Sequence, residues 1–371
     1  STHAGVRPQK TFSKYREPLT KLPNLVENQL LSYKDLVDRG IAEIFREFSP
    51  LHDYSEKKFD LEFISFELSA PKYDEVYAKE NKLTYEAPLR ARVKLSNKIL
   101  NTVKEQEIFM ADFPLMTVHG TFIINGVERV VVPQLARSFG VFFDSEETKG
   151  KRYFGAKIIP SRGVWIELGT EPDGGVYVRV DKKRKFSAIA LLRIFGFSSD
   201  EQIKKAFAHH EIAGPLMATL VERDEVKTLH DAYIEVYKRL RDGDLATPEN
   251  AKEYIDSIIS PERYDLSPVG RFRFNKRFGK SIDPKDKESQ VRTLTKEDLV
   301  EIVIHIIELN NNPNAVEDDI DHLGSRRVRY VGEMMAQKIR TGMMQMKRNI
   351  QDKMSVIDTE TTLPIAIINQ R

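Results

Sequence analysis

The most constraining feature of this sequence is a change in the spacing of its apolar residues part-way along the chain. Before Ser187, apolar and polar residues alternate in several short stretches, which is typical of half-buried β-strands. From Ser187 onward, apolar residues recur every three or four positions, which is the spacing of amphipathic helices. Because strands dominate early and helices late, the pattern predicts an α+β fold of mixed domains.

Two helices are predicted ahead of the first strands. Residues 25–37 carry one apolar face, with Asn24 as the expected cap and Gly40 as the expected end of the helix. A second short helix is predicted at residues 41–48, before Pro50.

The clearest strand signal is an alternation of apolar and basic residues over 89–95, with one face expected in the core and the other in water. Asn125-Gly126 stands between two β-branched runs. This dipeptide predicts a hairpin over 121–132, because it tolerates the positive φ of a tight primed turn. A second pair of strands is predicted at 163–168 and 176–180.

The later part of the chain predicts a series of helices. They are expected at residues 187–195, 200–208, 230–240, 299–309 and 328–354. Thr295 and Asp298 have the spacing of a capping box before one of them. Residues 280–296 are polar and charged, and they predict a flexible excursion between helices.

Composition excludes several kinds of site. The 371 residues include no cysteine, which excludes disulfides, thiol catalysis and cysteine-bound metals. No apolar run is long enough to span a bilayer, and residues 1–10 lack the apolar core of a secretory signal. The 58 basic and 56 acidic residues nearly balance, so only their distribution can indicate a nucleic-acid partner.

Basic residues gather in four places, some with interleaved phenylalanines. The clusters are Arg179 with Lys182, Lys183, Arg184 and Lys185; Lys238, Arg239 and Arg241; Arg271, Arg273, Lys276, Arg277 and Lys280; and Arg326, Arg327 and Arg329. Cations beside aromatic rings suit phosphate contact and base stacking. The alternative is a set of solvated faces with the phenylalanines in the core, and both interpretations stay open.

Other candidate residues favour ordinary structural roles. Trp165, the single tryptophan, is either a core anchor or a stacking platform beside Arg162 and Gly163. The histidines of 209–211 point in different directions on a helix, and the acidic residues of 318–321 match a magnesium site poorly. No phosphate-binding glycine loop or nucleophile motif is present in the sequence.

Long motifs carry a resemblance to a known family. They are residues 113–117 (FPLMT), 120–135 (GTFIINGVERVVVPQL), 137–144 (RSFGVFFD), 158–165 (IIPSRGVW), 263–271 (RYDLSPVGR), 319–327 (DIDHLGSRR) and 331–333 (VGE). Together they resemble the amino-terminal region of bacterial RNA polymerase beta subunits. The resemblance implies a protrusion domain at 1–140 and 317–371, with a lobe domain at 141–316 inserted in it.

The resemblance also implies a function. Such a chain is the first third of the beta subunit of a DNA-directed RNA polymerase, a nucleotidyltransferase, and it clamps DNA, contacts the non-template strand and docks regulators. The implied partners are DNA, RNA, the beta-prime and alpha subunits, sigma factor, and a transcription-repair coupling factor or CarD-type regulator. No cofactor is expected here, because beta-prime holds the catalytic magnesium. A cytoplasmic, nucleoid-associated location without membrane contact is expected.

Individual roles follow from the matching motifs. Trp165 is expected to stack on an unpaired non-template base, whereas Arg137, Asp321 and Arg326 form a pocket for an extruded guanine. Arg129 is expected beside the rifamycin pocket and the RNA exit side.

Further contacts with nucleic acid are expected at Lys183, Arg184, Arg271 and Arg273. A regulator is expected to add a strand at Val103, Lys104 and Glu105.

Two residues depart from the usual family pattern beside the guanine pocket: Phe139 replaces a proline and Ser325 an asparagine. No catalytic residue is expected in the chain. A free-standing basic adaptor and an independent enzyme are the alternative interpretations.

Overall fold

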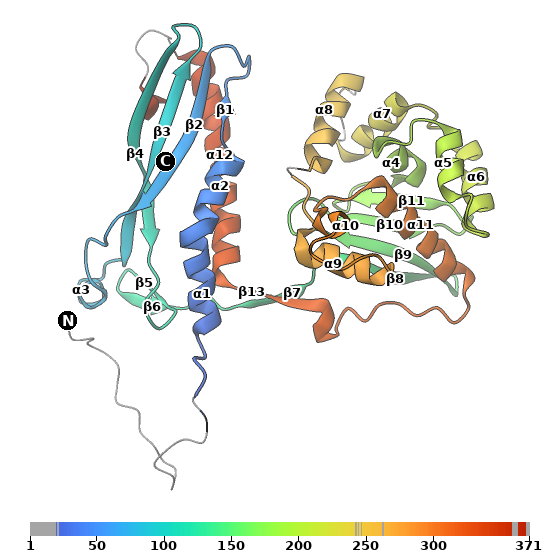
Figure 1. The fold of residues 1–371 in the computed structure, drawn as a ribbon, viewed down its shortest axis with the longest axis horizontal. Coiled ribbons are helices and arrows are strands. Elements are labelled where there is room, and N and C mark those ends of the chain that lie inside the picture. Colours follow the sequence, from blue (N-terminus) through green and yellow to red (C-terminus); the bar gives the residue numbers. More distant parts are fainter. Residues whose placement is uncertain are drawn as a thin grey trace. The chain divides into compact units, whose positions relative to one another are not determined.

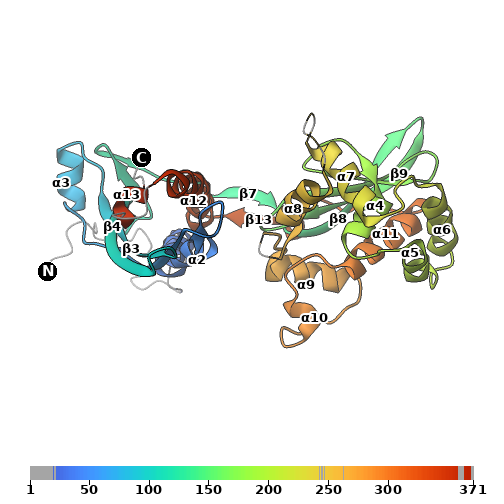
Figure 2. The ribbon, with the colours of Figure 1, turned by 90° about the horizontal axis from the view of Figure 1, so that it is seen from above.

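The computed structural model describes residues 20, 22–241, 243, 245, 247–261, 263–357 and 363–368. The chain forms two compact units, Ser1–Leu135 with Val328–Arg371, and Ala136–Arg327 (Figures 1 and 2). The second unit is inserted in the sequence of the first. Helices and antiparallel sheets occur together, which confirms the α+β class. The boundaries placed at 140/141 and 316/317, and the names protrusion and lobe, stay predictions.

The first unit is built on a four-stranded antiparallel sheet. Its strands, in order across the sheet, are β1 (Leu51–His52), β2 (Phe59–Leu68), β3 (Glu86–Asn97) and β4 (Thr102–Pro114). Its other elements are α1 (Glu27–Asp35), α2 (Ile41–Glu47), α3 (Glu75–Glu80), β5 (Phe122–Ile124), β6 (Val127–Arg129), α12 (Val331–Val356) and α13 (Pro364–Ile367). Apolar side chains of α2 and α12 pack on the sheet to form one core.

Strand β3 confirms the alternation expected from the sequence. Leu89, Val93 and Leu95 are buried, whereas Arg90 and Arg92 on the opposite face are exposed. The predicted hairpin turn is also confirmed. Asn125 and Gly126 have φ of 52° and 79°, as a type I′ turn requires. A Cβ at Gly126 would lie 2.7 Å from the Cα of Lys82, so this close approach requires glycine.

The prediction that Gly40 ends the first helix is wrong. The chain stays helical through a π-helical segment, Leu36–Gly40, and continues directly into α2. Gly40 itself has right-handed helical angles (φ −61°, ψ −40°). The burial of Ile41 and Ile44 explains the continuation, because the apolar stripe runs past the glycine into the core.

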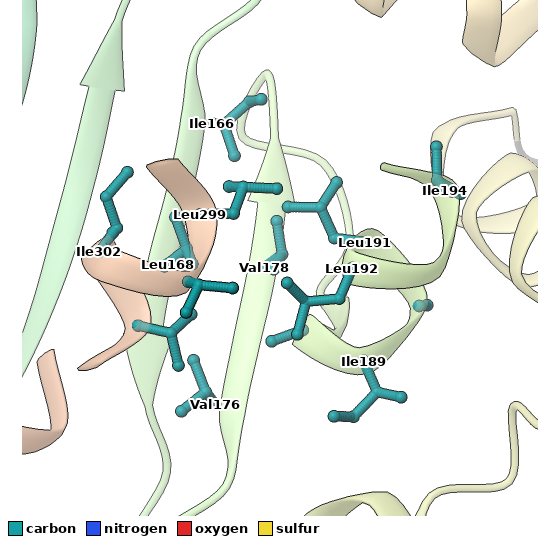
Figure 3. Packing of buried hydrophobic residues seen from close by; sticks show 14 of the residues in the cluster. Ile166, Leu168, Val176, Val178, Ile189, Leu191, Leu192, Ile194, Leu299 and Ile302 are labelled. Atoms are coloured by element: carbon teal, nitrogen blue, oxygen red, sulfur yellow. The ribbon is translucent and has the colours of Figure 1, made fainter. Parts of the chain in front are cut away.

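The second unit is a five-stranded antiparallel sheet covered by helices. In order across the sheet, the strands are β12 (Phe186–Ser187), β11 (Val176–Val180), β10 (Ile166–Thr170), β9 (Lys151–Ile159) and β8 (Gly140–Thr148). The helices are α4 (Ala188–Ile194), α5 (Asp200–Phe207), α6 (Ala213–Arg223), α7 (Leu229–Leu240), α8 (Pro248–Ile259), α9 (Ser267–Arg277), α10 (Lys287–Gln290) and α11 (Lys296–Asn311). In Figure 3, Leu192 of α4 and Leu299 of α11 lie around Val178 of the sheet.

Two predicted helix starts in this unit are confirmed by their caps. The Ser187 hydroxyl accepts a hydrogen bond from the Ile189 amide at 3.0 Å, at the start of α4. Thr295 and Asp298 form the expected capping box of α11, with each side chain accepting from the other's backbone N–H.

Residues 280–296 include a short helix and are anchored near their end, whereas the predicted flexibility of this segment stays a prediction. Figure 2 shows α10 within this segment, beyond the end of α9. Leu294 is buried, and the Leu266 amide donates to the Arg292 carbonyl at 2.7 Å. The polar composition gave no sign of these anchors, because they are backbone groups and one buried leucine.

The long helix predicted from residue 328 begins three residues later, at Val331. Val328 instead belongs to strand β13 (Arg326–Arg329), which pairs with β7 (Gln134–Arg137). These two strands lie where the chain passes between the units. The partner strand is far away in sequence, so local spacing could not indicate it.

Candidate nucleic-acid interface

Trp165 lies in the second unit, on the loop between β9 and β10. Its side chain is not enclosed, because 39% of the residue is exposed. The Trp165 carbonyl accepts a hydrogen bond from the Asp181 amide at 2.9 Å, which joins this loop to the turn after β11. An indole that is fixed by its backbone and exposed on its surface can stack against a flat group such as a base.

Asp321 and Arg326 lie together in the same unit. Their side chains form an ion pair, and Asp321 remains largely exposed. The ion pair orients the Asp321 carboxylate. The Arg137 guanidinium lies 6.0 Å from the centre of the Phe142 ring. The strands that carry Arg137 and Arg326, β7 and β13, are paired with each other.

Several contacts fix the backbone around these residues. The Ser138 amide donates to the Ser325 carbonyl at 2.9 Å, and the Arg273 guanidinium donates to the Gly324 carbonyl. Arg273 also lies 5.1 Å from the Phe142 ring, and burial lowers the pKa of its guanidinium. Arg273 thus fastens α9 to the loop that carries Asp321.

The two departures from the family pattern lie among these contacts. The Arg327 guanidinium stacks 4.0 Å from the centre of the Phe139 ring, an interaction that a proline could not provide in this form. Ser325 contributes its backbone carbonyl to the Ser138 amide, and any residue can make that bond. The replacements at positions 139 and 325 therefore alter the side chains near the Asp321 loop but leave the backbone hydrogen bond between Ser138 and Ser325 possible.

The basic cluster of residues 271–280 has a different role from the one its composition indicated. These residues form the end of helix α9, so Arg271, Phe274 and Phe278 share one face at helical spacing. Arg271 is 2% exposed, and its guanidinium donates to both Asp298 oxygens at 3.0 and 2.8 Å. Because Asp298 pairs with its buried guanidinium, Arg271 stabilises the core, and we leave it out of the interface.

Other cations of this cluster are also paired. Arg277 makes two hydrogen bonds to the Asp318 carboxylate, at 2.8 and 2.9 Å, and lies 4.6 Å from the Phe143 ring. The Lys280 ammonium lies 3.1 Å from Glu301. Carboxylates thus neutralise three of the five cations of this cluster, namely Arg271, Arg277 and Lys280, which favours the alternative of a partly buried structural face for these three.

The basic turn between β11 and β12 remains available to solvent. Asp181 and Lys182 have φ of 50° and 57°, and the Lys183 amide donates to the Val180 carbonyl, so the turn is tight. Lys183 and Arg184 are exposed. With the end of α7 they line an open pocket of about 620 Å³, whose full lining is Arg179, Lys182, Lys183, Arg184, Lys185, Arg239 and Leu240. This pocket is a concentration of positive charge suited to phosphate groups.

The expected regulator surface lies in the first unit, on strand β4. Among the described residues, this strand is at the edge of its sheet and pairs only with β3, so one row of its backbone groups faces away from the sheet. Val103 is 57% exposed and Glu105 is exposed, whereas Lys104 is half-buried. Near this edge, the Ile365 amide donates to the Gln106 side chain at 3.3 Å.

Arg129 ends strand β6 of the first unit and is exposed. The segment around it carries exposed apolar side chains, namely Val127, Val130, Val132 and Leu135. The contact expected at Arg129 therefore lies on an apolar surface rather than a basic one.

Acidic groups and histidines form no cluster able to hold a metal ion within the described part of the chain. Asp319 accepts the amides of Asp321 and His322, at 2.9 and 3.0 Å. The Glu308 carboxylate lies 3.0 Å from His210 and 3.0 Å from His305. Burial acts to raise the pKa of Glu308, but these two hydrogen bonds outweigh it and hold the pKa below its usual value.

Comparison with known proteins shows the family of the chain. Residues 137–329, more than half of the chain, match the family described as RNA polymerase Rpb2, domain 2. The chain belongs to this family. It is also 39% identical over 363 residues to the DNA-directed RNA polymerase subunit beta of Syntrophomonas wolfei, an alignment that covers 97% of the chain and 32% of that protein. The chain thus spans about a third of the length of the curated relative that it matches.

The sequence located the members of the candidate interface but not their assembly. Arg239 and Lys183 appeared in separate clusters, yet they line one pocket of this Rpb2 domain 2 unit. The part played by Phe142, beneath Arg137 and Arg273, had no sequence signal, since a phenylalanine in a strand is usually core. Among the described residues, no helix is long and apolar enough to cross a membrane.

Proposed function

We propose that this chain is the amino-terminal part of the beta subunit of a DNA-directed RNA polymerase, in which it holds DNA without taking part in bond formation. Its second unit acts as the lobe and its first as the protrusion. The catalytic magnesium belongs to the beta-prime subunit of the assembled enzyme, and the other partners are the alpha subunits, sigma factor and RNA. A cytoplasmic, nucleoid-associated location follows from this role.

The exposure of Trp165 is the observation that carries the proposal. Most lone tryptophans in a domain of this size anchor its core, but this one leaves 39% of its surface open at the end of a fixed loop. Stacking of a base on such a ring contributes about 1–3 kcal/mol and does not depend strongly on which base is present. Trp165 therefore retains an unpaired non-template base of the open promoter.

Arg137, Asp321 and Arg326 provide the selective contact. A carboxylate can accept hydrogen bonds from the N1–H and N2–H₂ edge of guanine, and this pattern is absent from the other three bases. The ion pair with Arg326 orients the Asp321 carboxylate, while Asp321 stays exposed to a ligand. Together these residues hold one extruded guanine.

The remaining surfaces take the other expected partners. Lys183 and Arg184 neutralise DNA phosphates at the basic pocket, and Arg273 contributes to the interface by fastening the Asp321 loop. Arg129 faces the rifamycin pocket and the RNA exit side. Strand β4 offers its edge at Val103–Glu105 to a transcription-repair coupling factor or CarD-type regulator, by strand addition.

The proposal is tested in a polymerase assembled with a beta subunit that contains this chain. Promoters that differ only in one non-template base downstream of the start site are compared by the lifetime of their open complexes. Trp165→Ala should shorten the lifetime on all promoters, whereas Asp321→Ala should abolish the longer lifetime of the guanine promoter.

The matched control is Asp173→Ala, which removes an exposed carboxylate from the turn between β10 and β11. It should leave all lifetimes unchanged. A guanine preference that survives Asp321→Ala would exclude the proposed pocket. Open-complex lifetimes that are unchanged by Trp165→Ala would exclude the stacking role.

A further inference from the structure

The motif at residues 263–271 has no part in the interface as described so far, yet it contacts the loop that carries Trp165. Residues Tyr264 and Asp265 precede helix α9, about a hundred positions downstream of that loop. The Ser161 and Arg162 amides both donate to the Asp265 carbonyl, at 2.7 and 3.1 Å. In return, the Asp265 amide donates to the Arg162 carbonyl at 2.8 Å. The loop is thus bridged to this segment by its backbone.

Gly163 fits this bridge in a way that other residues cannot. Its φ is +124°, a conformation that residues with a side chain rarely adopt. A Cβ at this position would lie 2.7 Å from Cδ2 of Tyr264, which is closer than real contacts allow. The loop backbone therefore packs directly against the Tyr264 ring, two residues before Trp165.

The ring of Tyr264, rather than its hydroxyl, makes this contact. Tyr264 is 1% exposed, and its buried hydroxyl has no hydrogen-bond partner among the described residues. An unsatisfied buried hydroxyl costs about 1–3 kcal/mol, so it does not explain why a tyrosine would stabilise this position. The aromatic ring supplies a rigid support.

The carboxylate of Asp265 fixes the segment that carries Tyr264. Its two oxygens accept hydrogen bonds from the Arg292 guanidinium at 2.8 and 2.6 Å, and one of them also accepts from the Ser267 amide at 2.7 Å. Arg292 is tied to the same segment by its carbonyl, which accepts from the Leu266 amide at 2.7 Å. A paired arginine fork of this kind restricts orientation more than a single bond would.

We infer that Tyr264, Asp265 and Arg292 are positioning residues for Trp165. They hold residues 161–163 against a rigid support, and the Asp181 amide holds the Trp165 carbonyl from the other side. The indole therefore projects from a backbone that is fixed at both ends, which lowers the entropy lost when a base stacks on it. This inference rests on the proposed stacking function of Trp165, but its structural part can be tested separately.

The test uses the fluorescence of the 371-residue chain, in which Trp165 is the single tryptophan. Asp265→Ala and Tyr264→Leu should raise the acrylamide quenching constant of Trp165 and lower its steady-state anisotropy, measured well below the melting temperature. Tyr264→Phe keeps the ring, so it should retain the original quenching constant and anisotropy. Asp265→Asn keeps the acceptor for Ser267 and should give intermediate values.

The control is again Asp173→Ala, at the far end of strand β10, which should leave Trp165 emission unchanged. If Asp265→Ala or Tyr264→Leu fails to fold, the comparison of Asp265→Asn and Arg292→Gln with the original chain decides the question. Unchanged quenching and anisotropy in folded variants of all three positions would overturn the inference.

The effect of positioning on function is then measured as the open-complex lifetime of the assembled polymerase. Asp265→Asn should shorten open-complex lifetimes in the same direction as Trp165→Ala, and should add nothing in a chain that already carries Trp165→Ala. Additive effects would overturn the positioning role. If Trp165→Ala alone has no effect on lifetime, the proposed stacking function fails, whereas the fluorescence result still tests the positioning itself.

Discussion

The buried pair of Arg271 and Asp298 gives the sharpest stability prediction. Replacement of Arg271 by methionine keeps much of the side-chain volume but leaves the Asp298 carboxylate 2% exposed and without the two hydrogen bonds from Arg271. The nearest remaining cation is Lys280, at 3.6 Å. Loss of one partner from a buried pair costs about 3–5 kcal/mol, because the other charge stays buried.

The matched control is Arg273→Met, on the same helix. Arg273 is half-buried and donates to a single backbone carbonyl, so its loss should cost about 0.5–1.5 kcal/mol. Adding Asp298→Asn to Arg271→Met should recover part of the lost stability, since the amide carries no charge and can still accept the Thr295 amide.

The assay is thermal unfolding followed by Trp165 fluorescence, which reports on the unit that contains both arginines. At roughly 2–4 °C per kcal/mol for a unit of this size, Arg271→Met should lower the midpoint by about 6–20 °C. Arg273→Met should lower it by only a few degrees. Equal midpoints for the two variants, combined with weaker DNA binding by Arg271→Met alone, would refute the structural role assigned to Arg271.

Three further predictions follow from individual contacts. Gly163→Ala should lower the melting temperature and alter Trp165 emission, since both its φ and its contact with Tyr264 exclude a Cβ; normal melting would contradict this. Burial acts to raise the pKa of Asp53, but hydrogen bonds from the Ser55 hydroxyl and three backbone amides outweigh it, and the net pKa lies below its ordinary value of 3.8. Its contribution to stability should therefore be complete above that pH and be lost as the pH falls below it, and acid titration should show a flatter profile for Asp53→Asn. Lys104→Glu should weaken calorimetric binding of a coupling-factor or CarD-type domain to β4, and unchanged affinity would count against this edge.

Local chemistry predicted the parts of the fold that depend on neighbouring residues. Asn125-Gly126 specifies its turn through backbone conformation alone, and the capping box of Thr295 and Asp298 closes within four residues. The alternation in β3 could also be predicted, because one face of the strand lies in the core and the other in water.

Features that depend on distant partners could not be predicted. Gly40 stays helical because the core continues beyond it, and β13 forms because β7 is available to pair with it. In the candidate interface, the arginines of 271–277 looked alike in sequence, yet Asp298 and Asp318 decide which are buried and paired. Helical spacing at this segment was masked by its alternation of phenylalanine and arginine, which also fits a strand.

The central claim is that Trp165 contacts the non-template strand in an assembled polymerase. The most direct measurement places a benzophenone amino acid at position 165 of the full beta subunit, irradiates a promoter open complex and maps the crosslinked strand. The account predicts a crosslink to unpaired non-template DNA near the start site, which should disappear when that region is kept double-stranded. Crosslinks to protein alone, or to the template strand, would contradict it.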